Sequence, residues 1–185
     1  QPTPFMGFIR SLICDGTGPV LKLADRPIAA GLLHQVAALD MDGDARLDLM
    51  ASGVYGTSQQ PNSLLTTFIN QGGANYPAFG TNYGTTLQPY ALAVGDFNHD
   101  GRSDVAVTHT YDEAQARLSI VLNLGGQPSF AGMTSQPSFG VGYGDTYNAV
   151  GDLNKDGKID VVVVSRGVTK LKQPAVVQVF LNTSP

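Results

Sequence analysis

The sequence is poor in several residue types that common folds require. Its 185 residues include one glutamate (Glu113) against 14 aspartates, one cysteine (Cys14) and no tryptophan. Glutamate favours helices, whereas aspartate favours turns, caps and tight metal-binding loops, so this composition argues against a helical bundle or a coiled coil. The single cysteine excludes a disulfide framework within the chain, and we expect it to be a small buried hydrophobic residue.

Long apolar runs and clusters of basic residues are missing as well. No stretch approaches the roughly 18 apolar residues of a membrane span, and residues 5–14 are interrupted by Arg10. The formal net charge is −4, the pI is about 5.1 and the basic residues are scattered, so nucleic acid is not expected as a partner. The chain begins at Gln1 instead of Met, which suggests a mature secreted protein or a proteolytic fragment.

The chain is rich in apolar residues and in residues that form turns. Hydrophobic residues make up 42% of it, which is enough for a folded domain with a core. Its 22 glycines and 11 prolines predict many turns between short strands.

Three segments repeat one pattern at a fixed spacing: residues 36–52, 92–108 and 148–164. Their first aspartates, Asp40, Asp96 and Asp152, are 56 residues apart in both intervals. Such a period predicts a repeat architecture in which each unit is one supersecondary structure.

Each unit predicts short strands around a polar loop. The first strands are expected at 36–39, 92–94 and 149–150, and the second at 49–52, 105–108 and 161–165. A further apolar stretch then ends in asparagine, at 64–70, 118–123 and 176–182. No helical periodicity of about 12 residues is present.

Four strands in about 56 residues are typical of a propeller blade. We therefore predict an all-β fold with propeller-type blades of four antiparallel strands. About three blades are expected, either partial or completed by another chain. The expected boundaries are 1–33 for the late strands of an incomplete repeat, then 34–89, 90–145 and a truncated 146–185 for three calcium-loop repeats.

The three polar loops share the pattern D-x-[DN]-x-D-x-x-x-D, in which alternate oxygen-bearing side chains converge on one point. Calcium takes six to eight oxygen ligands, and a backbone carbonyl at position 7 would add to the four side chains of each loop. The expected ligands at positions 1, 3, 5, 7 and 9 are Asp40, Asp42, Asp44, Arg46 and Asp48; Asp96, Asn98, Asp100, Arg102 and Asp104; and Asp152, Asn154, Asp156, Lys158 and Asp160. Three Ca²⁺ sites are thus predicted.

Two further loop positions refine this prediction. Position 6 is Gly101 or Gly157 in two loops but Ala45 in the first, where a positive φ would cost about 1 kcal/mol, so the first site is expected to be weaker or reshaped. Position 12 falls within a strand and is never Glu, which excludes an EF-hand. His99, at position 4, is expected to point outward, and no His or Cys joins the pattern, which argues against transition metals.

These units resemble FG-GAP/VCBS repeats, the calcium-bearing blades of β-propellers like that of the integrin α chain. The residues that carry the resemblance are the Asp-rich loops, the AVGD stretches at 93–96 and 149–152, and the Phe-Gly pairs at 79–80 and 139–140. The resemblance covers about residues 34–182. It implies an extracellular, secreted location and a role as an adhesion module, a lectin or an accessory domain of a carbohydrate-active enzyme. It also implies that calcium rigidifies each blade.

Three units are too few to close a ring, since propellers have roughly four to eight blades. Three explanations stay open. The chain is a fragment of a larger propeller; it dimerises into a ring; or its N-terminal strands complete the last blade of a neighbouring copy by strand addition, which builds a ring or a fibre.

Catalysis is not expected, because common catalytic motifs are absent and ten of the 15 acidic residues lie in the three loops. The favoured function is an extracellular calcium-binding structural or adhesion module, with self-assembly by strand exchange into a ring or fibre left open. One alternative is a carbohydrate-binding module that uses Tyr83, Tyr90, Tyr143 and Tyr147, although packing between blades explains these tyrosines better. The other alternative is a non-catalytic fragment of a larger secreted enzyme or receptor.

Overall fold

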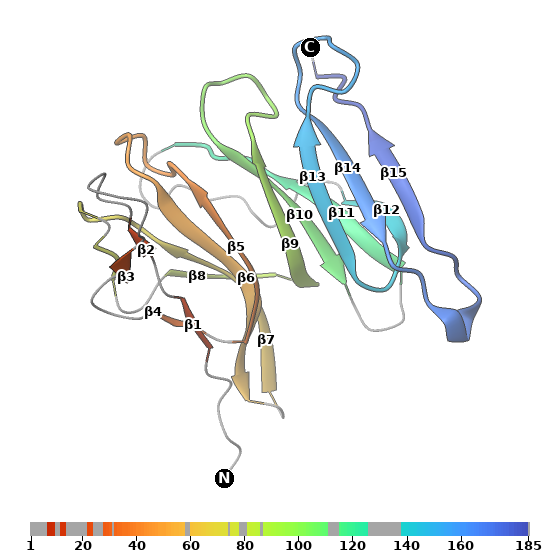
Figure 1. The fold of residues 1–185 in the computed structure, drawn as a ribbon, viewed down its shortest axis with the longest axis horizontal. Coiled ribbons are helices and arrows are strands. Elements are labelled where there is room, and N and C mark those ends of the chain that lie inside the picture. The colour runs from red at the N-terminus through yellow and green to blue at the C-terminus, as the bar shows by residue number, and fades with distance from the viewer. Residues whose placement is uncertain are drawn as a thin grey trace.

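The protein is an all-β chain in which three antiparallel sheets stand side by side (Figure 1). The computed structural model describes residues 7–9, 12–13, 22–23, 28–30, 32–57, 60–73, 75–77, 81–85, 87–110, 115–125 and 138–184. Within these residues the helical content is one 3₁₀ turn, η1 (Thr169–Leu171). No described helix has the length and apolar character needed to cross a membrane.

Each sheet is a simple meander of neighbouring strands. The first sheet has the order β5 (Leu32–Leu39), β6 (Asp48–Thr57), β7 (Gln60–Phe68) and β8 (Thr81–Gly84). The second sheet consists of β9 (Gln88–Gly95), β10 (Asp104–Thr110), β11 (Gln115–Val121) and β12 (Ser138–Tyr143). The third consists of β13 (Thr146–Gly151), β14 (Asp160–Ser165) and β15 (Val176–Phe180). These are propeller-type blades, as the sequence predicted.

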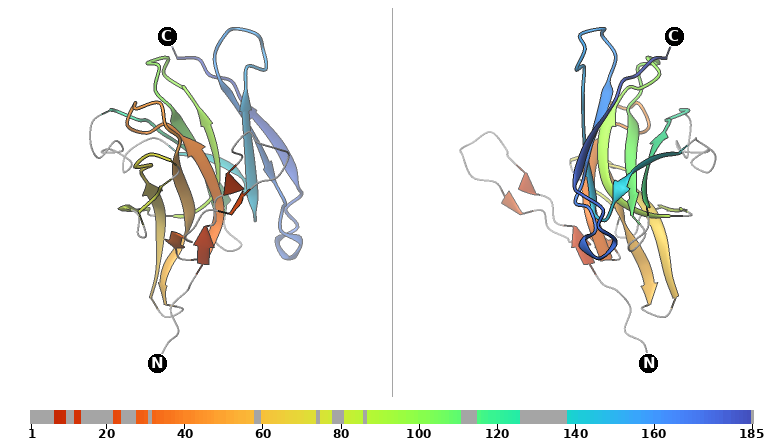
Figure 2. Two further views of the ribbon diagram at one scale, coloured as in Figure 1. Left: turned by 60° about the vertical axis from the view of Figure 1, so that its left-hand side comes forward. Right: turned by 90° about the vertical axis from the view of Figure 1, so that its right-hand side faces the viewer.

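The N-terminal strands pair with one another. β1 (Gly7–Ile9) runs antiparallel to β4 (Ile28–Ala30), and β2 (Leu12–Ile13) to β3 (Lys22–Leu23). The pair β2 and β3 extends away from the three sheets (Figure 2). In the described part of the chain, β15 therefore forms an unpaired edge of the third sheet.

The burial pattern of the central strands follows from this arrangement. Every residue of β10 is buried, because the second sheet has a neighbour on each face. In β14 the residues facing the second sheet, such as Val161 and Val163, are buried, whereas Val164 on the other face is 44% exposed. Runs of valine suit such strands, since a β-branched side chain packs well on a pleated surface.

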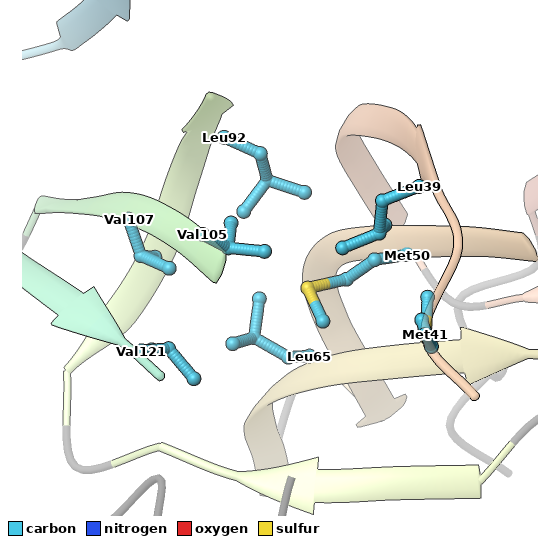
Figure 3. Packing of buried hydrophobic residues seen from close by; sticks show 8 residues of the cluster. All are labelled: Leu39, Met41, Met50, Leu65, Leu92, Val105, Val107 and Val121. Atoms are coloured by element: carbon cyan, nitrogen blue, oxygen red, sulfur yellow. The ribbon is translucent and has the colours of Figure 1, made fainter. Parts of the chain in front are cut away.

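The apolar core lies between the sheets. Between the first and second sheets, Met41, Met50 and Leu65 meet Leu92 and Val105 (Figure 3). The second and third sheets bury a matching cluster: Phe97, Ala106, Ala116, Leu118, Val141, Val161 and Val163. Burial of these side chains supplies the main favourable term in folding, so the sheets stabilise each other pairwise.

Polar contacts between sheets repeat with the same period. Ser52 Oγ donates to the Tyr90 carbonyl at 2.6 Å, and Thr108 Oγ1, 56 residues later, donates to the Thr146 carbonyl at 3.3 Å. The side-chain amide of Gln35 also forms two hydrogen bonds with the backbone of Leu92, at 2.9 and 3.0 Å. These bonds satisfy buried polar groups and fix the position of one sheet relative to the next along the strand direction.

We expect Leu118→Ala to destabilise the protein by about 2–5 kcal/mol, because it leaves a cavity between the second and third sheets. The matched control is Val177→Ala. Both residues stand five positions before the terminal asparagine of their unit, but Val177 is 67% exposed, so its truncation should cost about 1 kcal/mol or less. Urea unfolding measures both values, and equal losses would contradict the described packing.

Candidate metal centre

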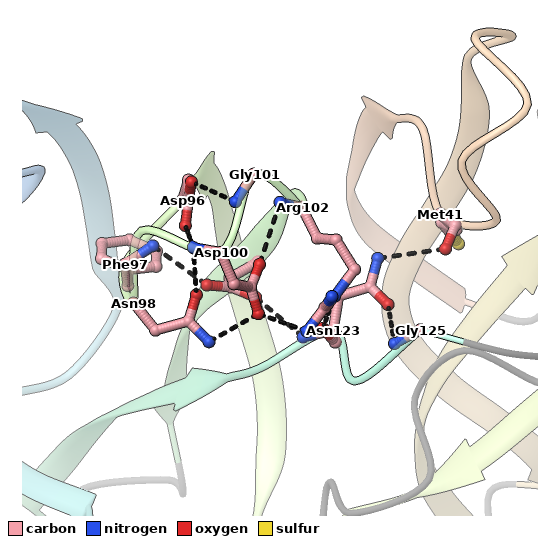
Figure 4. A network of polar contacts seen from close by, with 10 residues as sticks. Met41, Asp96, Phe97, Asn98, Asp100, Gly101, Arg102, Asn123 and Gly125 are labelled. Carbon is pink, nitrogen blue, oxygen red and sulfur yellow. Dashed lines mark hydrogen bonds and ion pairs between the residues drawn. The ribbon is translucent and has the colours of Figure 1, made fainter.

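The three Asp-rich loops connect the first two strands of each sheet and share one hydrogen-bond pattern. The aspartate at position 1 accepts the backbone N–H of position 6 at 2.9 Å in all three: Ala45 to Asp40, Gly101 to Asp96 and Gly157 to Asp152. Position 5 accepts the N–H of position 7, also at 2.9 Å each time: Arg46 to Asp44, Arg102 to Asp100 and Lys158 to Asp156. The loops are therefore tightly wound, with these carboxylates bonded to their own backbone, as Figure 4 shows for the second loop.

The ninth aspartate differs from the others because it is fully buried. Asp48, Asp104 and Asp160 are each 0% exposed. In each loop one carboxylate oxygen accepts the N–H of position 2 at 2.9 Å, and the other accepts the N–H of an asparagine beyond the third strand at 2.7–2.8 Å. This carboxylate therefore joins the loop, the second strand and the end of the third strand.

Burial raises the pKa of two of these carboxyls, Asp48 and Asp104. Desolvation raises the pKa of Asp104 and outweighs the two N–H donors, and the negative charges of Asp100 and Asp96 add to the rise. The pKa of Asp48 is raised in the same way, by desolvation and by Asp42 and Asp44. A group that is costly to ionise in the metal-free protein gains most from a nearby cation.

In the second and third loops, the carboxyl at position 5 has a pKa below its ordinary value. Desolvation is the largest single effect on Asp100 and raises its pKa, but the Asn98 amide, the Arg102 N–H and the Arg102 guanidinium together hold that pKa below its ordinary value. The pKa of Asp156 is lowered by the Lys158 N–H and the Asn154 amide. These carboxylates are therefore ionised at neutral pH and are available as anionic ligands.

Three of the four aspartates predicted as ligands in the first loop lie close together. Oxygens of Asp40, Asp42 and Asp48 lie within 4.8 Å of one another, close enough to share one ion. In the second and third loops position 3 is Asn98 or Asn154. Each of these asparagines accepts from the position-5 N–H and donates its amide to the position-5 carboxylate, at 2.8 and 3.0 Å. The oxygen donors that hard cations prefer are thus present in every loop.

Backbone strain is shared evenly among the loops, which sequence reasoning did not anticipate. Ala45 at position 6 has a φ of 65°, the left-handed conformation expected to burden the first loop. Position 4 is left-handed too, and there the first loop has Gly43, whereas the others have His99 and Lys155. Each loop therefore places one glycine and one other residue in this region, so Ala45 does not single out the first loop.

The side chain at position 7 has a role that the pattern alone did not indicate. Arg46 and Arg102 form ion pairs with the position-5 carboxylates of their own loops. Their Nε atoms also donate to the carbonyls of Asn70 and Asn123, at 3.1 and 2.7 Å. Each arginine thus ties its loop to the chain after the third strand, and its own carbonyl stays the group predicted to bind metal.

The asparagine that ends each third strand is a second feature missed by sequence reasoning. Besides bonding the buried aspartate, Asn123 donates its amide to the carbonyl of Met41 at 3.0 Å (Figure 4). Asn182 donates likewise to Phe97 at 2.9 Å. Both acceptors occupy position 2 of the preceding loop, so the asparagine links neighbouring sheets. The recurrence of asparagine in all three units was the available signal.

Several other predicted features can now be placed. His99 is exposed, as expected. Tyr83 packs against the first core cluster, and Tyr90 meets Tyr147 across two sheets with ring centroids 5.5 Å apart. Tyr83 and Tyr90 thus have packing partners within the fold, whereas Tyr147 is 58% exposed. The Phe-Gly pair at 79–80 and Cys14 lie outside the described residues.

We expect Asn123→Ala to destabilise the chain by about 1–3 kcal/mol, because it leaves the buried Met41 carbonyl without a partner. Asn75→Ala is the control, since that side chain is exposed. Denaturant unfolding at fixed metal concentration tests both variants. A loss no larger than that of the control would mean that the asparagine does not link the sheets.

The raised pKa of Asp104 predicts a pH effect in metal-depleted buffer. Its contribution to stability is present below the unfolded-state pKa, near 3.8, and is lost as the pH rises through the higher folded-state value. The free energy of unfolding of the wild type minus that of Asp104→Asn should therefore fall as the pH rises above 3.8. Urea unfolding from pH 3 to 7 measures this difference, and a rise with pH would contradict the assignment.

Comparison with known proteins agrees with this architecture. Residues 40–107 match the family described as FG-GAP-like repeat, a segment that spans the first loop, the rest of the first sheet, and the second loop. The chain is also similar to integrin alpha-IIb of Mus musculus, with 27% identity over 173 residues. That alignment covers 83% of this chain and 16% of the integrin. Residues 40–107 of the chain are therefore FG-GAP-like repeat sequence.

Proposed function

We propose that this chain is an extracellular, non-catalytic structural or adhesion module whose three loops bind calcium. The observation that carries the proposal is the recurrence, at a period of 56 residues, of one wound loop closed by a buried aspartate. A lone acidic loop is a common turn. Three loops in which the position-1 aspartate accepts the position-6 N–H and a buried aspartate closes the loop point to a shared ligand.

The donor set fits a hard cation. The first loop offers the close carboxylates of Asp40, Asp42 and Asp48, to which Asp44 and the carbonyl of Arg46 would be added. In the second loop the donors would be Asp96, Asn98, Asp100 and Asp104 with the carbonyl of Arg102, and in the third Asp152, Asn154, Asp156 and Asp160 with the carbonyl of Lys158. These are all oxygen donors, which suit Ca²⁺ better than zinc or copper.

Calcium would offset the electrostatic cost of the loops. Asp48 is buried, desolvated and repelled by Asp42 and Asp44. A divalent cation between these groups turns mutual repulsion into attraction and holds the loop to the sheet. Because the buried aspartate also bonds the end of the third strand, binding in the loop stiffens the whole blade.

The adhesion role rests on the similarity to integrin alpha-IIb, of which this chain spans about one sixth. We infer a module that presents its sheets and loops to a protein partner outside the cell. Calcium sites of extracellular modules bind weakly, with dissociation constants of about 10⁻⁴–10⁻³ M. Exposed, carboxylate-rich loops suit an affinity in this range. We include association of the chain with itself in this structural role.

We expect Ca²⁺ to raise the thermal and urea stability of the chain relative to the same sample in excess chelator. At a free concentration 100 times the dissociation constant, one site stabilises the folded state by about 2.7 kcal/mol. Titration calorimetry should give three sites in the wild type and two in Asp152→Ala.

The control for this titration is Asp145→Ala, which removes a carboxylate outside the loops that pairs with Arg166 at 3.4 Å. It should leave the number of bound ions at three. An unchanged melting temperature in calcium and in chelator would overturn the proposal, as would the loss of an ion in Asp145→Ala.

A further inference from the structure

The buried aspartates of the three loops are joined by one continuous chain of hydrogen bonds. In the first loop, Asp48 accepts the N–H of Met41 at 2.9 Å, and the carbonyl of Met41 accepts the side-chain amide of Asn123 at 3.0 Å. The backbone N–H of Asn123 in turn donates to Asp104, the buried aspartate of the second loop, at 2.7 Å. Figure 4 shows Asn123 reaching from the second loop to Met41. Only these two residues separate the buried carboxylates of the neighbouring loops.

The same chain of bonds continues to the third loop. Asp104 also accepts the N–H of Phe97 at 2.9 Å, and the carbonyl of Phe97 accepts the amide of Asn182 at 2.9 Å. The backbone N–H of Asn182 donates to Asp160, the buried aspartate of the third loop, at 2.8 Å. The chain of bonds therefore runs from the first loop to the third through the second.

The link between the first two loops lies where water cannot replace it. Asp48 and Asp104 are 0% exposed, and Met41 and Asn123 are each 1% exposed. Hydrogen bonds in such an interior are electrostatically stronger than in water, and a buried group that loses its partner finds no other. Movement of one member of this chain therefore costs free energy at the next.

Met41 stands between Asp40 and Asp42, two of the predicted ligands of the first loop. Its two peptide groups join it to these aspartates, and both are held by hydrogen bonds, one to Asp48 and one to Asn123. The position of Asn123 thus fixes the backbone from which the first loop projects its carboxylates.

This connection makes ordering of one loop favourable for binding in the next. An occupied second loop holds Asp104, and with it Asn123 and the backbone of Met41. Part of the conformational entropy that the first loop must lose on binding is then already lost. Coupling free energies are reciprocal, so an occupied first loop favours the second equally. Repulsion between ions in neighbouring loops opposes this effect but is screened beyond about 8 Å at physiological ionic strength.

The first unit contains an asparagine that lacks this link. Asn70 takes the place of Asn123, and its backbone N–H bonds Asp48 at 2.7 Å. Its side-chain amide, however, donates to the carbonyl of Leu47 in its own loop at 3.1 Å. Asn70 therefore closes one loop without joining two, which makes it a matched control.

We propose that neighbouring loops bind calcium with positive cooperativity, and that Asn123 and Asn182 transmit the coupling. The inference rests on the calcium sites proposed above and adds how they depend on one another. The first and second sites are coupled directly, as are the second and third, whereas the first and third communicate through the second. The asparagines are positioning residues, because their side chains hold a neighbouring loop and are not among the predicted ligands.

The first test removes one site at a time from the full chain and follows the others in a calcium titration. The amide NMR signals of Gly43, Gly101 and Gly157 report each site separately, since each N–H donates to the position-1 aspartate of its loop. Asp96→Ala should weaken both remaining sites about fivefold or more. Asp40→Ala should weaken the second site to a similar extent and the third far less. Unchanged affinities in Asp96→Ala overturn the proposal, as does equal weakening of the second and third sites in Asp40→Ala.

The second test asks whether Asn123 carries the coupling, by a double-mutant cycle. In an Asn123→Ala background, adding Asp40→Ala should no longer weaken the second site, whereas adding Asp152→Ala should still do so through Asn182. A merely structural asparagine would lower stability without changing these ratios.

Two further variants sharpen this cycle. Asn123→Asp retains the side-chain oxygen that accepts the N–H of Gly125 at 3.0 Å but lacks the amide donor, so it should also uncouple the first two sites. Asn70→Ala should leave them coupled. Coupling that persists in both Asn123 variants, or that is lost in Asn70→Ala, contradicts the assigned role of Asn123.

The glycine signals also separate this inference from the proposed function. Three ions bound with affinities that no neighbouring variant changes overturn the coupling alone. Absence of calcium binding at all three loops overturns both proposals.

Discussion

The buried carboxylate at the ninth position of each loop is the interaction on which the rest of the unit depends. Asp48, Asp104 and Asp160 each accept two backbone N–H groups, one from the loop and one from the residue after the third strand. A buried carboxylate is costly unless hydrogen bonds or a cation compensate for its lost hydration. The fold supplies two donors, and in the first loop Asp40 and Asp42 bring further carboxylate oxygens within 4.8 Å of Asp48. The buried carboxylate is therefore shared by the hydrogen-bonded link between strands and the proposed metal site.

The asparagine after the third strand extends this device from one sheet to the next. Its backbone N–H serves its own sheet, while in the second and third units its side-chain amide bonds position 2 of the preceding loop. The apolar side chain at that position, Met41 or Phe97, enters the core between the same two sheets. Loop conformation and sheet packing are therefore coupled. Calcium binding at one loop is expected to stiffen its neighbour as well as its own blade.

Much of the candidate site could be predicted from the sequence because its elements are local. Nine consecutive residues contain the whole set of side-chain donors, and a period of 56 residues repeats it three times. The residue types predicted backbone strain at Ala45 but not at position 4. The φ angles show that position 4 is left-handed too, so the glycine at Gly43 compensates in the first loop for the strain at Ala45. For the arginines at position 7, the pattern predicted only that their carbonyls bind metal. Their side-chain contacts with Asn70 and Asn123 could not be predicted, because those residues lie more than 20 positions away in the sequence.

The sequence by itself determined the repeat, the all-β class, the position of the loops and their oxygen-rich chemistry, since each depends on spacing and residue type over short distances. The tertiary structure decided which face of each sheet is covered. Ala106 and Val162 stand at equivalent positions in similar strands, but only the first is fully buried, because the second sheet has a neighbour on both faces and the third on one. Burial depends on which sheets meet in space, and no pattern within a single unit contains that information.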